Sequence, residues 1–387
     1  MAPRPPERHK ISKAQKRKQL QSSPSPKALL ASAEQCLHMG NLTEALSFAT
    51  RALTILHERH HGDSVASLPA LNLLGEITVE HGDAEKARGW FERAITVDPR
   101  GEVPEEQGGG ADNFLWLAQL SEEGGEDSVQ WFRKGAEVLR RQLREGDGVE
   151  AEEAREEKKA KLASALCGVA EVYMTDLSWD DGEAESQCDK AMAEALQIAP
   201  ENVEVLQTLA SVRISQLRKD EARKHLAKSL SLWKDLEPDD PDIPAFPTRI
   251  SLSRLLMEAD MEEEAMDVLE RLVSEDDQSV EAWYLGGWCQ YVQAEKRKSR
   301  MDGKPSEESL AETSLTLQRS RKWLLHCLRL YGLVGYEDER LQEHVNELIG
   351  SLNAVFGEAA EGADANEEDD DWEDAEEGSD DEIMDGV

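Results

Sequence analysis

Few residues of this chain have the types and spacing that catalysis requires. The sequence contains no Gly-x-Gly-x-x-Gly, Walker, His-Glu-x-x-His or Gly-x-Ser-x-Gly motif. The run Gly108–Gly110 precedes a helical stretch, but Glu105 and Glu106 beside it would repel a phosphate, which favours a linker. His60 and His61 have no third ligand nearby, which favours a surface pair over a metal site. We therefore predict that the protein is not an enzyme and holds no cofactor or metal.

The cysteines and the hydropathy pattern bear on the compartment. The five cysteines are odd in number, far apart and without the spacing of a zinc site: Cys36, Cys167, Cys188, Cys289 and Cys327. We expect them to be buried, reduced thiols. The N-terminus carries no apolar signal, and no run of about 18 apolar residues occurs, so secretion and membrane insertion are not expected. These features predict a protein of the cytoplasm, the nucleus or both.

The charge balance indicates the kind of partner. Lys and Arg total 44 against 81 Asp and Glu, which gives a formal net charge of -37. Such a charge repels nucleic acid and anionic membranes and attracts a basic protein. The alternative is that the acidity only keeps the protein soluble. We predict a basic protein client and no direct binding to nucleic acid or membrane.

The elements that would position binding residues recur with a period of about 40 residues. The clearest unit carries Leu71, Leu74, Gly75, Gly82, Asp83, Ala87, Phe91, Ala94 and Pro99. The leucines would fill the groove between two helices, and the small residues would lie where the helices cross closely. Gly82 permits a turn with positive φ, and Pro99 ends the second helix. These residues look like a tetratricopeptide repeat (TPR), which is a two-helix hairpin.

Weaker copies of the unit cover most of the chain and predict an all-α TPR superhelix of about seven helical hairpins. We expect breaks at Gly101–Gly110, Glu145–Glu157 and Pro238–Pro247. In the last unit, the second helix is expected at Ser320–Leu330, beyond a polar insertion around Lys296–Ser309.

The two ends of the chain differ in composition from the repeats. Residues 1–27 are rich in Pro, Ser, Gln, Lys and Arg, whereas residues 357–387 lack Lys and Arg and carry acidic runs. Neither end has enough apolar residues to offset the entropy of ordering. We predict a disordered basic arm over 1–27, the TPR superhelix over 28–356 and a disordered acidic tail over 357–387.

Both ends carry a candidate binding motif. In the arm, four basic residues resemble a nuclear import signal that an import receptor would bind: Lys13, Lys16, Arg17 and Lys18. The alternative is a solubilising arm. In the tail, an aromatic residue stands among acids, as in a segment that shields a basic surface: Asp369, Asp370, Asp371, Trp372, Glu373 and Asp374. The alternative is a passive, solvated tail.

The first helix of each hairpin in a TPR array lines the concave face, where partners bind. The offsets of the clearest unit place on that face Asn72, Glu76, Val79, Glu80, Gln119, Glu122, Glu123, Met257, Glu258, Tyr284, Trp288 and Tyr291. Carboxylates there would steer a basic segment, and aromatic rings would hold its cations for roughly 0.5–2 kcal/mol. The alternative is that Trp288 and Tyr291 pack against the helix that carries Trp323 and Leu324.

The order of these features resembles a fungal family, the TPR assembly chaperones dedicated to the large-subunit ribosomal protein L-four. The resemblance rests on Ser23–Lys27, Ala28–Leu30, Gly40-Asn41, the Trp283–Trp288 segment, Arg321–Leu324 and Asp369–Glu373. It implies a chaperone that binds the long basic internal loop of L-four, keeps it soluble and escorts it to the nucleus for assembly into the pre-60S subunit. We expect a monomer that binds one client.

Two alternatives have the same fold. One is a general TPR scaffold in another complex, such as a histone or chaperone assembly. The other is a heat-shock co-chaperone, whose clamp for acidic C-termini would need Lys and Arg on the concave face. The predicted concave positions are mostly acidic or apolar, which argues against the co-chaperone.

Overall fold

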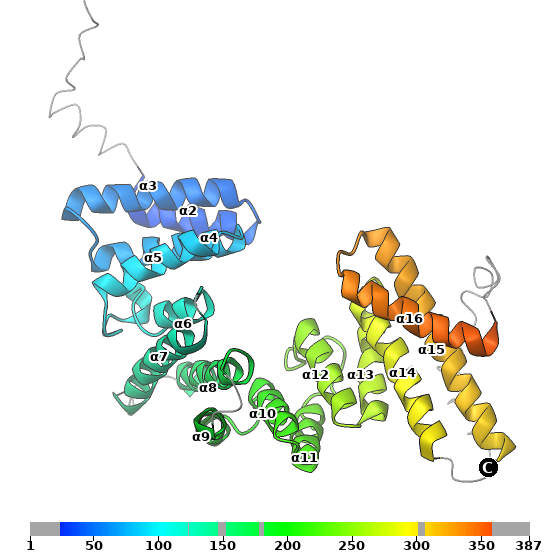
Figure 1. Ribbon diagram of the computed structural model, residues 1–387. Coiled ribbons are helices and arrows are strands. Elements are labelled where there is room, and N and C mark those ends of the chain that lie inside the picture. The colour runs from blue at the N-terminus through cyan, green and yellow to red at the C-terminus, as the bar shows by residue number, and fades with distance from the viewer. Residues whose placement is uncertain (1–23, 123, 146–151, 178–181, 301–305, 358–387) are drawn as a thin grey trace, which may run out of the picture. The chain divides into compact units, whose positions relative to one another are not determined.

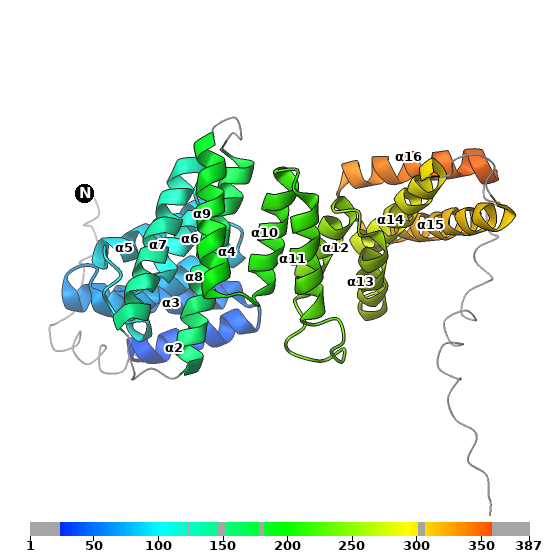
Figure 2. The same ribbon diagram turned by 90° about the horizontal axis from the view of Figure 1, so that it is seen from below.

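The computed structural model describes residues 24–122, 124–145, 152–177, 182–300 and 306–357, and all regular structure in these residues is helical (Figures 1 and 2). The α-helices are α2 (Pro26–His38), α3 (Leu42–His60), α4 (Leu68–Glu80), α5 (Ala84–Val97), α6 (Asp112–Gln119), α7 (Gly125–Glu145), α8 (Glu152–Thr175), α9 (Gly182–Ile198), α10 (Val203–Ser215), α11 (Lys219–Ser231), α12 (Phe246–Glu258), α13 (Glu262–Glu275), α14 (Val280–Arg300), α15 (Glu307–Val334) and α16 (Glu339–Phe356). Two short 3-10 helices, η1 (Val65–Ser67) and η2 (Glu105–Gln107), precede α4 and α6.

Consecutive helices pair as hairpins within two compact units, unit 1 (Met1–Glu237) and unit 2 (Pro238–Val387). Unit 1 contains the pairs α2/α3, α4/α5, α6/α7, α8/α9 and α10/α11. Unit 2 contains α12/α13 and α14/α15, and α16 packs against α15 (Figure 1). The predicted all-α fold of about seven hairpins is confirmed, and α16 is an additional helix.

Four helices begin earlier than predicted. Helix α2 starts at Pro26, inside the arm predicted for residues 1–27, because Ser25 caps it by accepting the Ala28 N–H at 3.2 Å and proline suits a first turn. Helix α8 starts inside the break predicted at Glu145–Glu157, and α12 starts inside the one predicted at Pro238–Pro247. Helix α15 also begins well before its predicted start.

Helices α14 and α15 form a longer hairpin than predicted and run side by side (Figures 1 and 2). The predicted helix Ser320–Leu330 is the later part of α15, and both ends of the segment Lys296–Ser309 belong to the two helices. The helix expected at Ser320–Leu330 therefore begins earlier than predicted, because the polar residues at both ends of Lys296–Ser309 extend α14 and α15. The two helices approach closely at Gly286 because glycine has no Cβ, and a Cβ there would lie 2.1 Å from the Trp323 ring.

The loop between α5 and α6 is packed against the molecule. The buried Asp98 carboxylate accepts the N–H groups of Glu102 and Val103 at 2.9 and 3.1 Å. A Cβ on Gly109 would lie 2.3 Å from the Val103 carbonyl oxygen. The break at Gly101–Gly110 is confirmed, and its glycines lie in the predicted linker between α5 and α6, where they let the loop fold closely on itself.

The hydrophobic core is divided among neighbouring helices, as expected of repeats. Phe91 of α5 is fully buried against Gly75 of α4, and its ring stacks on Trp116 of α6 with 5.5 Å between ring centroids. All five cysteines are buried and free, which confirms that prediction. None of the helices in the described ranges is long and apolar enough to cross a membrane.

Four hairpins turn in the same way between their helices. In the α4–α5 turn, Gly82 has φ +78°, and its N–H and that of the next residue donate back to carbonyls at the end of α4. The same bonds and a positive φ recur at Gly40, Leu217 and Asp260. Glycine adopts this conformation without strain, whereas leucine does not.

The substitution Leu217→Gly is expected to stabilise unit 1. Leu217 has φ +59° and is 88% exposed, so glycine would remove about 1–2 kcal/mol of strain and little packing. The greater freedom of glycine in the unfolded chain opposes folding by about 0.5–1 kcal/mol. The free energy of unfolding, measured in urea, should therefore rise by about 0.5–1 kcal/mol. The reciprocal variant Gly82→Leu should lose a similar amount. A less stable Leu217→Gly would mean that the leucine side chain itself supports the turn.

Candidate functional site

The first helices of the hairpins in unit 1 carry a row of carboxylates. We call it the acidic row: Glu34 on α2, Glu76 on α4, Asp112 on α6, Glu171 on α8 and Glu204 on α10. Its glutamates on α2, α4 and α8 each follow directly on a buried small residue: Ala33, Gly75 or Ala170. The members on α6 and α10 lie in the first helical turn, where the helix dipole stabilises negative charge.

Glu76 is close enough to Glu34 and Asp112 for repulsion, and Glu171 is close enough to Glu204. Burial, together with the charges of Asp112 and Glu34, raises the pKa of Glu76. Burial and the charge of Glu204 likewise raise the pKa of Glu171. Glu171 is nevertheless exposed to solvent, so the protein displaces part of its water without closing over it. Such partly desolvated, mutually repelling carboxylates are stabilised by a bound cation.

Most of the acidic row has no cationic partner. Lys161 donates to Asp112 at 3.2 Å. No Lys, Arg or His in the described ranges forms an ion pair with Glu34, Glu76, Glu171 or Glu204. This negative charge is therefore available to a partner.

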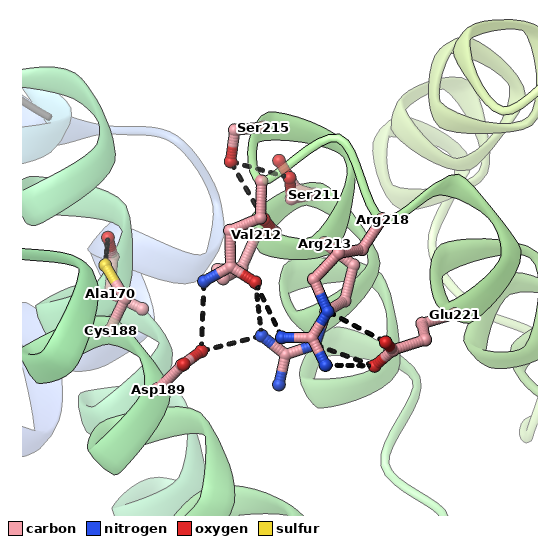
Figure 3. A network of polar contacts seen from close by, with 10 residues as sticks. Ala170, Cys188, Asp189, Ser211, Val212, Arg213, Ser215, Arg218 and Glu221 are labelled. Carbon is pink, nitrogen blue, oxygen red and sulfur yellow. Dashed lines mark hydrogen bonds and ion pairs between the residues drawn. The ribbon is translucent and has the colours of Figure 1, made fainter.

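Other carboxylates of unit 1 are neutralised by arginines, as the network in Figure 3 shows. Asp189 on α9 accepts from Arg213 at 2.6 Å, and Glu221 on α11 accepts from Arg218 at 2.6 Å. Although burial alone would raise the pKa of Asp189, hydrogen bonds from Arg213 and Gln216 lower it. This network ties α9 to α10 and α11, so its role is structural.

The residues predicted on α4 divide between surface and packing roles. Glu76 belongs to the acidic row, and Glu80 is exposed at the end of the helix. Asn72 donates from Nδ2 to the Gly108 carbonyl at 2.9 Å, and Val79 packs against a buried hydrophobic cluster. Both Asn72 and Val79 therefore stabilise the unit itself.

The residues predicted on the next first helix fall at or beyond its end. Gln119 is exposed in the last turn of α6. The placement of Glu122 on this helix is wrong, because α6 ends at Gln119 and a turn with positive φ at Gly124 and Gly125 leads into α7. Glu123 lies outside the described residues.

The aromatic residues predicted in unit 2 pack against their own chain and stay partly exposed. The Tyr284 hydroxyl lies 2.7 Å from Nδ1 of His344 on α16, and that imidazole lies edge-on to Trp288 at 5.2 Å. Trp288 and Tyr291 pack against the hydrophobic cluster that contains Leu324, as the alternative interpretation expected. These partly exposed rings therefore help to hold α14 against α15 and α16, and their role in binding a client stays a prediction.

The end of α12 contributes little negative charge. Met257 is partly buried and Glu258 is exposed. At the position that follows a buried small residue, where α2, α4 and α8 carry a glutamate of the acidic row, α12 carries Arg254 after Ser253. Arg254 forms an ion pair with Glu281 of α14.

The predicted motifs of the two ends lie outside the described residues: Lys13, Lys16, Arg17, Lys18, Asp369, Asp370, Asp371, Trp372, Glu373 and Asp374. Their roles in import and shielding stay predictions. His60 and His61 are both exposed. In the part of the chain that the structure describes, no three His, Cys, Asp or Glu side chains gather as a metal ion would require.

The sequence interpretation missed Glu34, Asp112, Glu171 and Glu204. For Glu34 and Glu171 a signal was present, since each directly follows a small residue of a first helix, as Glu76 follows Gly75. Asp112 and Glu204 lie instead in the first turns of their helices. The third and fourth repeats hide this register, because α6 is short and α8 has Ala170 in place of the glycine.

Comparison with known proteins identifies the family. A tetratricopeptide repeat model matches residues 25–100. A protein of Emericella nidulans named "Probable assembly chaperone of rpl4" is 47% identical over 368 residues, which cover 93% of this chain and 91% of the relative. The chain belongs to this family of rpl4 assembly chaperones. The family resemblance and the TPR fold predicted from the sequence are both confirmed.

Two further members of the rpl4 assembly chaperone family extend the comparison. A Schizosaccharomyces pombe protein of the same name is 37% identical over 287 residues, which cover 74% of this chain and 80% of the relative. The solved structure of "Assembly Chaperone of RpL4 (Acl4) (Residues 1-338)" is 49% identical, has a TM-score of 0.64 and covers 71% of this chain and 99% of that chain. These names describe chaperones rather than enzymes.

Proposed function

We propose that this protein is a dedicated chaperone of ribosomal protein L-four. It binds the basic extended loop of one client molecule, keeps the client soluble and accompanies it from the cytoplasm to the nucleus for assembly into the large ribosomal subunit. The proposal is carried by one observation: in the described ranges, every member of the acidic row except Asp112 lacks a counter-ion, on a chain that is 47% identical to a protein named "Probable assembly chaperone of rpl4".

The charge of the acidic row fits such a client. A basic loop that is disordered when free attracts RNA and other polyanions. The carboxylates of Glu34, Glu76, Glu171 and Glu204 compete for the same Lys and Arg side chains, and each exposed ion pair contributes about 0–1 kcal/mol. Ribosomal RNA has a denser negative charge, so it can displace the chaperone when the client is assembled.

Charge reversal in the acidic row tests this proposal. The double variant Glu34→Lys/Glu76→Lys should bind purified L-four about tenfold more weakly or worse, since each change replaces an attraction with a repulsion. The matched control is Glu58→Lys/Glu85→Lys, which makes the same charge change at exposed positions on the second helices α3 and α5. The control should lose less than about threefold.

Calorimetric titration of the full-length proteins measures both affinities, and circular dichroism checks that each variant is folded. If both double variants lose the same factor in affinity for L-four, the loss comes from the change in net charge and not from the acidic row. If Glu34→Lys/Glu76→Lys binds L-four with unchanged affinity, the acidic row is not the client site.

The nuclear step is tested separately. Fluorescence imaging of the chain with Lys13, Lys16, Arg17 and Lys18 changed to Ala should show loss of nuclear accumulation. Unchanged accumulation would reject a role of this arm in import.

A further inference from the structure

One face of helix α15 in unit 2 is basic, although the chain as a whole is acidic. Over residues 313–336 the sequence has four Lys and Arg and no Asp or Glu, whereas the whole chain has 81 Asp and Glu against 44 Lys and Arg. Spacings of three and four residues place one set of these side chains on a single face of the helix. We call this face the basic strip: Leu315, Arg319, Lys322, His326, Arg329 and Leu333.

Two exposed cations of the basic strip have no carboxylate partner. Arg319 and Lys322 are exposed, and neither forms an ion pair with an Asp or Glu of the described ranges. Burial raises the pKa of Glu270 on α13, and the charge of Arg319 opposes this rise, but the two side chains form no ion pair. By contrast, Arg297 on α14 pairs with Glu312 of α15 at 3.1 Å. The positive charge of Arg319 and Lys322 is therefore available to another segment.

Apolar and aromatic side chains accompany these cations. Leu315 is 49% exposed and Leu333 is 71% exposed, one toward each end of the basic strip. Between them, the His326 ring packs on Trp283 of α14 with 4.2 Å between ring centroids. Exposed leucines beside unpaired cations suit a segment that is acidic and also carries a large apolar side chain.

The chain contains such a segment, and it begins beside the basic strip. Gly357 is the last described residue and follows α16, and its carbonyl accepts a hydrogen bond from the Arg321 guanidinium at 2.9 Å. Arg321 directly precedes Lys322 on α15. The predicted acidic tail, residues 357–387, therefore starts next to the strip.

The length and composition of the tail match the basic strip. The tail carries 16 Asp and Glu and no Lys or Arg, and its larger apolar residues include Trp372, Ile383 and Met384. Trp372 lies 15 positions after Gly357. Such a length spans up to about 50 Å, whereas the strip is about 27 Å long. Tethering also gives the tail an effective concentration on the order of millimolar at the strip.

We propose that the acidic tail docks on the basic strip of its own chain. Carboxylates of the segment 369–374 pair with Arg319 and Lys322, and the Trp372 ring lies on Leu315 and against a cation of the strip. The docked tail neutralises cations of unit 2 that would otherwise attract RNA and other polyanions. The basic surface that the tail shields is thus one of the chain's own, and this shielding needs no client.

Fluorine NMR of the full-length chain labelled with fluorotryptophan tests the docking. The variant Trp372→Phe assigns the Trp372 signal, and a labelled synthetic peptide of residues 357–387 gives the signal of a free tail. In the wild-type chain the Trp372 signal should be broader than the peptide signal and displaced from it. About 1 M NaCl should move it to the peptide position, because salt screens exposed ion pairs.

Charge reversal in the basic strip should release the tail at ordinary salt. Arg319→Glu/Lys322→Glu is expected to give the free-peptide signal for Trp372, since each change replaces an attraction with a repulsion. The matched control Arg300→Glu/Arg340→Glu makes the same charge change at exposed positions on α14 and α16 and should keep the docked signal. All four side chains are exposed, so both variants are expected to fold, and circular dichroism checks this.

Carbodiimide cross-linking gives an independent measurement, because this reagent joins a lysine amine to a carboxylate in contact with it. Lys322 should be joined to carboxylates of the tail. Arg319→Glu should lower the yield about fivefold or more, whereas Arg340→Glu should leave it unchanged. In a mixture of unlabelled and isotope-labelled chains, mass spectrometry should find these cross-links within single chains.

Three outcomes would overturn the proposal. The first is a wild-type Trp372 signal that coincides with the signal of the free peptide. The second is an equal response of the two double variants, which would mean that the strip is not the docking surface. The third is cross-links that join labelled to unlabelled chains, which would assign the strip to the tail of a second copy.

Discussion

Replacing Phe91 with alanine is expected to lower the free energy of unfolding of unit 1 by about 3–5 kcal/mol. The Phe91 side chain is fully buried, fills the space over Gly75 and stacks on Trp116 of the next hairpin. Alanine would leave a cavity between α4, α5 and α6, and helices that are held by their neighbours cannot all move to close it. Urea unfolding followed by circular dichroism measures the loss.

Phe48→Ala is the matched control in the same unit. The Phe48 ring is only partly buried on α3, so its removal should cost clearly less, about 1–2 kcal/mol. Equal losses in the two variants would contradict the special place of Phe91 between two hairpins.

Gly286→Ala is expected to destabilise unit 2 by about 1–3 kcal/mol or more. The added methyl would lie 2.1 and 2.2 Å from two carbons of the Trp323 ring. This ring cannot easily withdraw, because it is buried and packs against Trp283 at 4.6 Å between ring centroids. Helices α14 and α15 would have to separate. Thermal unfolding followed by circular dichroism, with near-ultraviolet bands for the tryptophans, measures the effect.

Gly350→Ala is the control for the same chemical change in the same unit. Gly350 is exposed within α16, and a Cβ there would meet no atom within 4 Å. Alanine should therefore stabilise the helix by about 0.5–1 kcal/mol. A stabilised Gly286→Ala variant would show that α14 and α15 approach less closely than described.

The hairpin fold could be predicted because its rules are local. Leu74, Gly75, Phe91 and the turn at Gly82 lie within one repeat, and each acts through a neighbour in the same hairpin. Hydrophobic spacing and a positive φ are readable from such a stretch. The same reasoning selected Glu76, which belongs to the acidic row, and its role in binding a client stays a prediction.

Contacts between repeats could not be predicted in this way. The hydrogen bond from Asn72 to Gly108 depends on how a long loop folds back, which no spacing rule encodes. The partial burial of Tyr284 and Trp288 depends on α16, whose packing across α14 follows no repeat pattern in the sequence. The pairing of Glu171 with Glu204 needs the register of two degenerate repeats at once. Tertiary packing decides each of these cases.

The buried cysteines give the molecule internal reporters of local opening. Cys188 lies in α9, Cys289 in α14 and Cys327 in α15. Burial raises the pKa of Cys188 to about 11 and those of Cys289 and Cys327 to about 12, so almost no thiolate is available to an alkylating reagent while the helices stay packed. The alkylation rate of each thiol then counts how often its own hairpin opens. A bound partner that contacts several hairpins would lower the alkylation rates of all their cysteines together. A partner that binds one hairpin would lower only the rates of the cysteines in that hairpin.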